Sequence, residues 1–296
     1  MNALSQTKHD SVADAVHGRT GHSSVLELTA DMTLATRSRM AADDLRLGLR
    51  QFQLALVLGW LDIKLRYRGS LLGPFWLTLS TAIMVASLGV LYSALFKMEL
   101  HDYLPYLALS LVLWNFIGSV VGEGCTSFTE SESLIRSIRM PYTLYALRVA
   151  VRNVIVLGHN VVVIAGVFVI FMIPPKATAL LALPALALWA VDIVAIIILL
   201  GAFCARFRDI PPIVASVMQL AFFLSPIIWK PELLGPKARF LPLNPFYALF
   251  EIVRAPLLGS APSHVTVAFA LFYSALLCLV SWLLFVRVRG RLAFWV

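Results

Sequence analysis

The stretch that decides the fold is DIKLRYRGSLLGPFW, from Asp62 to Trp76. Four charged residues, Asp62, Lys64, Arg66 and Arg68, fall within seven positions, and the chain is then apolar for about two dozen residues. An ionised side chain at the centre of a bilayer costs roughly 2.5–3.5 kcal/mol on insertion scales, so these four would together cost on the order of 10 kcal/mol. We therefore expect the charged stretch to lie outside the membrane and the apolar residues after it to cross.

The composition is that of a membrane protein. Of the 296 residues, 60% are hydrophobic and 14% are charged, whereas soluble domains carry about a quarter charged residues. The net charge of +8 would suit nucleic acid, but the basic residues border apolar blocks, which favours a membrane surface instead. The three cysteines lie more than 70 residues apart and form no disulfide framework or C-x-x-C pair. We expect them to be packing residues.

Six apolar segments are long enough to span a bilayer, whose core of about 30 Å needs about 20 residues of helix. They are Pro74–Phe96, Pro105–Gly122, Val151–Ile173, Thr178–Ala205, Pro212–Trp229 and Val265–Val286. The sequence therefore predicts an all-α membrane protein with six transmembrane helices per protomer.

The placement of Lys and Arg predicts the orientation. With the N-terminus inside the cell, cytoplasmic segments hold 18 Lys and Arg and external segments hold six; without the first 44 residues the numbers are 14 and six. Because cytoplasmic loops carry the excess of positive charge, we expect both termini in the cytoplasm. The expected location is the bacterial cytoplasmic (inner) membrane.

Before Asp62, the sequence LRLGLRQFQLALVLGWL predicts a helix lying flat on the cytoplasmic surface, since its apolar residues fall on one stripe. The stripe consists of Leu45, Leu49, Phe52, Leu56, Ile63 and Tyr67. The chain is accordingly divided into a partly disordered cytoplasmic tail (1–44), an amphipathic interface helix (45–73), a six-helix transmembrane domain (74–286) and a cytoplasmic C-terminal tail (287–296).

The long external connection Lys230–His264 contains a further short helix. Asn244 followed by Pro245 is typical of a helix N-cap and first helical position. The apolar residues after Pro245 fall on one helical face. We expect a short amphipathic helix that lies in, or re-enters, the outer leaflet before the last span.

The cations at the end of the interface helix have two interpretations. Lys64, Arg66 and Arg68, with Tyr67 between them, could meet phosphates of anionic lipids or of a lipid-linked substrate. They could equally be a positive-inside anchor for the first span. Gly69 and Gly73 allow the chain to turn sharply after them, because glycine adopts positive φ without steric cost.

The segment DIKLRYRGSLLGPFWLTLS resembles the first segment of the type-2 ABC exporter permeases of the polysaccharide (O-antigen and capsule) export family. The resemblance continues through LIRSIRMPYTLYALRVAVRNVIVLGHN (Leu134–Asn160), LSPIIWKPELL (Leu224–Leu234) and LNPFYALFEIVRAPLLG (Leu243–Gly259), and covers most of residues 50–290. It implies a transport subunit, not an enzyme, that works as a homodimer on a lipid-linked glycan. Some family members have a proline near Ser80, and its absence here leaves the bending of the first span open.

The resemblance also implies a separate ABC ATPase subunit in two copies, which would hold ATP and Mg²⁺. This chain has no G-x-x-x-x-G-K-[ST] phosphate loop, and we expect no cofactor in it. The internal loop Cys125–Met140 would be the coupling element; Ser127-x-x-Glu130 and Thr129-x-x-Glu132 fit capping boxes, and Pro141 would end the helix. The alternative is an ordinary connector. The expected ATPase contacts are Glu130, Glu132, Leu134, Ile135, Arg136 and Arg139.

Aromatic residues gather near the expected external end of the spans. Aromatic rings suit the apolar C–H faces of pyranose sugars, so they are candidates for the translocation path, although belt and core packing would also explain them. The candidates are Tyr92, Phe96, Phe222, Phe223, Trp229, Phe246, Tyr247 and Phe250.

Three polar residues fall inside apolar segments: His159, Asn160 and Asp192. Intramembrane polar groups line functional paths or join helices, and both roles stay open. Arg148 and Arg152 are expected to be anchors or phosphate contacts.

Two other functions are weighed against glycan export. An ABC exporter for teichoic acid, lipid or a drug would share these features. A polyprenyl-phosphate-dependent glycosyltransferase would need grouped carboxylates, but the sequence has no D-x-D cluster, and its six histidines have no paired metal-ligand spacing. We expect no catalytic residues, no metal site and no nucleic-acid partner.

Overall fold

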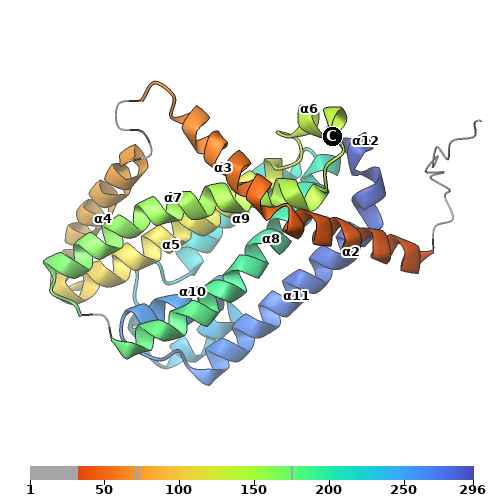
Figure 1. Ribbon diagram of the computed structural model, residues 1–296. Helices are drawn as coiled ribbons and strands as arrows, with labels where there is room; N and C mark the ends of the chain where they lie inside the picture. The colour runs from red at the N-terminus through yellow and green to blue at the C-terminus, as the bar shows by residue number, and fades with distance from the viewer. Residues whose placement is uncertain (1–32, 71–72, 74, 175) are drawn as a thin grey trace, which may run out of the picture. The chain divides into compact units, whose positions relative to one another are not determined.

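The computed structural model describes residues 33–70, 73, 75–174 and 176–296 (Figure 1). These residues form helices joined by turns, and this part of the chain contains no strand. The chain divides into two compact units, Met1–Thr36 and Arg37–Val296, and the second holds all helices below except the first residues of α2. The predicted all-α fold class is confirmed. The disorder expected for the N-terminal tail concerns mainly residues 1–32, which lie outside the described residues, as does Pro74.

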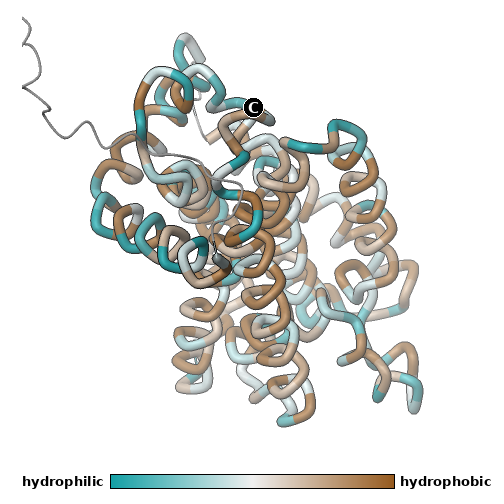
Figure 2. The backbone as a smooth tube through the Cα atoms, turned by 90° about the vertical axis from the view of Figure 1, so that its right-hand side faces the viewer, coloured by the Kyte–Doolittle hydropathy of each residue, from teal (hydrophilic) through white to brown (hydrophobic). Residues whose placement is uncertain are grey.

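Among the described residues, five helices are long and apolar enough to cross a membrane, so this is a multi-pass membrane protein. They are α4 (Phe75–Phe96), α5 (Leu100–Thr126), α7 (Tyr142–Ile170), α8 (Ala182–Arg206), which continues the 3₁₀ turn η1 (Ala177–Leu181), and α11 (His264–Val288). Hydrophobic residues run along most of their length (Figure 2). Helices α5 and α7 pack side by side, and α8 packs against both α5 and α11.

The fifth expected span differs from the prediction. Instead of a helix over Pro212–Trp229, the structure has α9 (Ile210–Leu224), whose 15 residues extend about 22 Å and fall short of a bilayer core of about 30 Å. The helix ends because Pro226 has no N–H group and restricts the residue before it. Ser225 is accordingly extended, with φ −96° and ψ 146°.

The expected short helix in the external connection is confirmed as α10 (Pro245–Leu257). It follows a 3₁₀ segment, η2 (Pro231–Leu243), which is kinked at Gly235. Asn244 is its N-cap, and the Asn244 side-chain oxygen accepts the backbone N–H groups of Phe246 (2.9 Å) and Tyr247 (3.3 Å). Helix α10 packs against α5, α8 and α11, so it is held within the protein.

The single interface helix predicted from residue 45 is two helices, α2 (Leu34–Arg50) and α3 (Phe52–Arg66), which meet at Gln51. Its packing face also differs from the predicted stripe. The side that contacts α7 is made of small residues, among them Ala55 and Gly59; a Cβ atom on Gly59 would lie 2.9 Å from Val151 Cγ1.

Most of the stripe is therefore not buried, and Leu45, Leu49, Phe52 and Leu56 line an open apolar groove against α7, α8 and α11. Leu49, Phe52 and Leu56 are exposed, Leu45 and Tyr67 are half-buried, and Ile63 is buried. Small residues let the helix backbones approach closely, and this leaves the larger side chains free to meet lipid. The glycines that follow confirm the expected turn, since Gly69 (φ 83°) and Gly73 (φ 54°) have positive φ angles.

The helix in the internal loop is the short α6 (Glu132–Ser137). The predicted capping boxes are wrong: Ser131 is the N-cap, without a side-chain capping bond, because α5 and the turns after it extend to Ser131. The Ser127 hydroxyl instead donates to the Gly124 carbonyl, and the Thr129 hydroxyl to that of Thr126. Pro141 is the N-cap of α7; α6 ends ahead of it, at Ser137.

The chain finishes in a 3₁₀ turn, η3 (Arg289–Arg291), and a short helix, α12 (Leu292–Trp295). The three cysteines are free; Cys125 and Cys204 are buried and Cys278 is half-buried. Their positions are compatible with the expected packing role.

Candidate functional site

One end of the second unit brings together segments that are far apart in the sequence. Buried Asp44 on α2 accepts the backbone N–H groups of Tyr142 (3.2 Å) and Thr143 (3.0 Å) at the start of α7. The same carboxylate pairs with Arg289 Nε at 2.9 Å. From α6, the Arg136 guanidinium donates to the Val296 carbonyl (2.6 Å), and Figure 1 shows the C-terminus beside α6 and α12. Helix α2, the internal loop and the C-terminal segment therefore share one end.

The cationic residues at the end of α3 and just after it lie near the contacts of α3 with α5 and α7. Lys64 and Arg68 are exposed and have no ion-pair partner among the described residues. Arg66 differs from them, because its Nη1 atom bonds Glu123 Oε1 of α5 at 3.0 Å. Tyr67 is half-buried, and burial raises the pKa of its phenol.

Glu123 also belongs to a network of ion pairs that joins α3, α5 and α7. Its second oxygen, Oε2, accepts from Arg152 Nε (2.8 Å) and from Asn153 Nδ2 (2.7 Å). Asp62 of α3 binds Arg148 through two hydrogen bonds (2.7 and 2.5 Å) and contacts Arg152 Nη1 at 3.3 Å.

The network explains how charged groups are accommodated near the ends of the apolar helices α5 and α7. Arg152 is 8% exposed and Asp62 is 11% exposed, and a buried charge is tolerated when it is paired and hydrogen-bonded. With Arg66, Arg148 and Arg152 against Asp62 and Glu123, the network carries one surplus positive charge. An anionic group that reached the network would therefore meet a net positive charge, and it could take the place of a carboxylate as the partner of an arginine.

A polar cavity adjoins the network. It has a volume of about 510 Å³ and lies between α4, α5 and α7. Asn153, which bonds Glu123, is one of its lining residues, together with Ser80 and Asn160. Near the place where some members of the expected family have a proline, the Ser80 hydroxyl donates to the Leu77 carbonyl inside a continuous α4.

The internal loop presents most of the expected ATPase contacts on its surface. Glu132 and Arg136 form an ion pair of 2.8 Å on α6, Glu130 accepts the Thr126 hydroxyl at 2.8 Å, and Arg139 is exposed. Leu134 and Ile135 are half-buried and pack against the hydrophobic core. The exposed face of the loop is therefore polar and charged.

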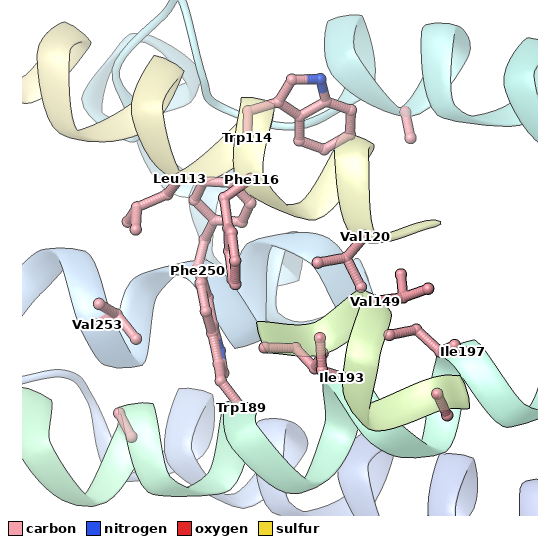
Figure 3. Close-up of a cluster of buried hydrophobic side chains, with 14 of the residues drawn as sticks. Leu113, Trp114, Phe116, Val120, Val149, Trp189, Ile193, Ile197, Phe250 and Val253 are labelled. Carbon is pink, nitrogen blue, oxygen red and sulfur yellow. The ribbon is translucent and has the colours of Figure 1, made fainter. Parts of the chain in front are cut away.

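The expected path aromatics separate into two groups. Phe222, Phe246 and Phe250 surround Trp114 of α5 at ring-centre distances of 5.8, 5.5 and 6.0 Å. Figure 3 shows Phe250 between Trp114 and Trp189, and Phe250 is 2% exposed. This group belongs to the packed core.

The remaining candidates lie outside the Trp114 cluster, and of these Phe223 is exposed and the others are half-buried. Tyr92 and Phe96 stack on each other near the end of α4, at 5.6 Å. Phe223 is exposed, and the half-buried Trp229 donates its indole N–H to the Phe223 carbonyl. Half-buried Tyr247 lies in the first turn of α10.

Buried polar groups hold the non-helical segment that follows α9. The Pro226 carbonyl accepts from Tyr106 Oη and from Arg254 Nη1, both at 2.6 Å, and the Ile228 carbonyl accepts from Tyr103 Oη at 2.5 Å. Arg254 is 1% exposed; it also pairs with Glu251 and lies 4.3 Å over the Tyr106 ring. These buried bonds therefore fix the conformation of the non-helical segment after α9.

The three intramembrane polar residues, two of them adjacent on α7 and one on α8, have different partners. His159 Nδ1 is 2.8 Å from the Ile155 carbonyl of its own helix. Asp192 accepts the Ser274 hydroxyl (2.6 Å), which joins α8 to α11. Asn160 faces the polar cavity.

The family model for ABC-2 type transporters matches residues 53–258, from α3 to the end of α10. The chain belongs to this family. Among curated proteins, this ABC-2 transporter chain is 23% identical over 199 residues to the O-antigen export system permease protein RfbA of Myxococcus xanthus. The match covers 66% of the chain and 76% of that protein. Two proteins of the same name from Klebsiella pneumoniae are each 21% identical over 253 residues, 82% of the chain and 94% of their own length.

Several residues of this ABC-2 transporter site were not candidates from the sequence. Glu123 follows the expected end of a span at Gly122, and a carboxylate beside an apolar segment is a signal that could have found it. Arg254, a cation within an apolar stretch, is a second such signal. The hydroxyls and amides of the cavity, such as Thr81 and Asn115, give no signal in the sequence, because the packing of three helices brings them together.

Proposed function

We propose that this chain is the membrane subunit of an ABC exporter that moves a lipid-linked polysaccharide, an O-antigen or similar glycan, across the bacterial inner membrane. Membership of the ABC-2 family supports a transport role. The names of the curated relatives, O-antigen export system permease proteins, support a glycan over a drug or another lipid as cargo.

The energy for export would come from a separate ABC ATPase subunit, present in two copies and acting on a homodimer of this chain. The absence of a G-x-x-x-x-G-K-[ST] motif from the sequence supports this division. The exposed, charged face of the α6 loop, with Glu130, Glu132, Arg136 and Arg139, is the proposed contact with the ATPase. ATP and Mg²⁺ would bind in that partner.

The α6 end of the unit would face the cytoplasm, with both termini on that side. The excess of Lys and Arg in the segments assigned to that side supports this orientation. The bonds of Asp44 to α7 and Arg289, and of Arg136 to Val296, support a common side for these segments.

The observation that carries the proposal is the cationic end of α3 beside the paired network. Exposed Lys64 and Arg68 would hold the phosphates of the lipid-linked glycan, with Tyr67 beside them, while Arg66 would have to exchange Glu123 for a phosphate oxygen. Beyond this point, the accessible aromatics Tyr92, Phe96, Phe223, Trp229 and Tyr247 would contact sugar rings.

Export by bacterial cells that lack their own permease tests this proposal, with the chain and its ATPase supplied in trans. Near an anionic surface, each Lys or Arg contributes about 1 kcal/mol, so the double variant Lys64→Gln, Arg68→Gln should bind the phosphates about thirtyfold less tightly. We expect a large fall in surface glycan at unchanged permease abundance.

The matched control is Lys237→Gln, Arg239→Gln, which removes the same charge from the exposed η2 segment. The control should export normally. Export by the Lys64, Arg68 double variant at the rate of this control would contradict the proposed docking.

A further inference from the structure

The cavity between α4, α5 and α7 is of the size that small molecules occupy. Its volume of about 510 Å³ falls within the range of about 300–1,000 Å³ that is typical of ligand pockets. The lining residues come from the first half of α4, from the second half of α5 and from the centre of α7.

Polar and apolar side chains both line the cavity, although it lies at membrane depth. Its hydroxyl and amide side chains are those of Ser80, Thr81, Asn115, Ser119, Asn153 and Asn160, and the described residues place no charged side chain in it. Polar residues inside spans mark substrate paths, and the lack of charge favours a neutral ligand. A hydrocarbon chain would contact the apolar lining residues Leu77, Met84, Val156 and Leu157 but offer these six polar side chains no hydrogen-bond partner. A sugar offers hydroxyls to the polar groups and an apolar C–H face to the others, so the lining favours a sugar over a lipid tail.

Asn160 is an independent sign that the cavity accepts a hydrogen-bonding ligand. Its side chain lines the cavity and is 7% exposed, yet its Oδ1 atom has no hydrogen-bond partner within the described part of the chain. Buried amide groups are almost always hydrogen-bonded. A sugar hydroxyl donating to Oδ1 would satisfy this one.

Two residues of the lining are aromatic. Trp114 and Phe116 of α5 border the cavity at 8% and 6% exposed, while their rings also pack against the core, Trp114 against Phe250 and Phe116 against Trp189. Aromatic surfaces fit the apolar C–H face of a pyranose ring, while amides and hydroxyls fit its edge. The chemistry of this lining is therefore that of a neutral sugar site.

The position of the cavity relates it to the proposed phosphate site. Asn153 lines the cavity and also donates to Glu123, and Glu123 in turn holds Arg66. A diphosphate held at the end of α3 would thus be two side chains away from the cavity.

We propose that this cavity receives the neutral sugar units next to the phosphate of the lipid-linked glycan. This inference rests on the proposed function, and it adds a sugar-recognition site to it. Recognition there makes the permease select a glycan-bearing lipid over the bare lipid diphosphate.

Two substitutions alter the cavity, Gly118→Phe and Asn160→Leu, and a third serves as the control. Gly118 lines the cavity and has open space where a Cβ atom would stand, so the side chain of Gly118→Phe can enter the cavity from α5. Gly122, one turn further along α5, also has open space but lies outside the cavity, and Gly122→Phe is the matched control. Asn160→Leu removes the unpaired amide at similar volume.

The test measures the binding of two lipids to the full permease–ATPase complex in nanodiscs: polyprenyl diphosphate bearing a neutral trisaccharide, and the bare polyprenyl diphosphate. The unmodified complex should bind the sugar-bearing lipid about tenfold more tightly, a difference of about 1.4 kcal/mol. Gly118→Phe and Asn160→Leu should abolish this preference without weakening binding of the bare lipid. Gly122→Phe should retain it.

The outcomes distinguish this inference from the proposed function. Equal binding of the two lipids by the unmodified complex, or a preference that survives both cavity variants, overturns the sugar site and leaves the phosphate docking intact. If neither lipid binds, the proposed function fails, and the sugar site fails with it.

Discussion

Glu123 shows how much of this molecule depends on single side chains. Its two oxygens accept from Arg66, Arg152 and Asn153, and so one carboxylate joins α3, α5 and α7. Asp62 does the same for Arg148 and Arg152. Each of these ion pairs joins residues far apart in the chain, and for that reason the sequence predicts the charges but not their pairing.

Replacing Asp62 should destabilise the protein. Asp62→Asn leaves Arg148 and Arg152 facing a neutral amide in a mostly buried setting, and hydrogen bonds between charged groups contribute about 1.5–3 kcal/mol each. We expect about 2–3 kcal/mol of lost stability, measured as a lower half-unfolding temperature in detergent. The control is Asp43→Asn on α2, where the carboxylate is exposed. A fall no larger than that of the control would show that the network contributes nothing.

Among the secondary-structure elements, the end of α9 shows that hydropathy predicts an apolar segment but not where its helix ends. Residues 225–229 are largely apolar, so a hydropathy window extends the helix through them, whereas Pro226 indicates that it ends there. The Asn244–Pro245 signal correctly predicted the start of α10. The capping-box prediction for the α6 loop was wrong because its serine and threonine hydroxyls bond carbonyls of the preceding turn.

The bonds to the α9 break should stabilise it measurably. Tyr106→Phe removes the hydroxyl that donates to the Pro226 and Trp229 carbonyls, and it should lower the stability by about 1–2 kcal/mol. The matched control is Tyr145→Phe, because the Tyr145 hydroxyl is buried and has no partner within the described residues. Its removal should be neutral or slightly stabilising.

Thermal unfolding of the two variants in one detergent makes this comparison. Equal losses for Tyr106→Phe and Tyr145→Phe would mean that the carbonyl contacts do not hold the segment.

For the whole molecule, length and hydropathy were enough to predict an all-α membrane protein, and five of six spans became long apolar helices. The resemblance of four segments predicted the family that the ABC-2 match confirms. The polar cavity and the tie between α2, α7 and Arg289 could not be predicted, since each depends on how helices from distant parts of the chain pack.

The account depends above all on the cationic end of α3 facing the cytoplasm while η2 faces outward. Two single-cysteine variants, Arg68→Cys and Lys237→Cys, place a thiol at exposed positions on the two sides, in a background where Cys125, Cys204 and Cys278 are serine. A membrane-impermeant maleimide applied to intact spheroplasts should label Lys237→Cys at once and Arg68→Cys only after permeabilisation. Labelling of Arg68→Cys from outside intact spheroplasts would contradict the account.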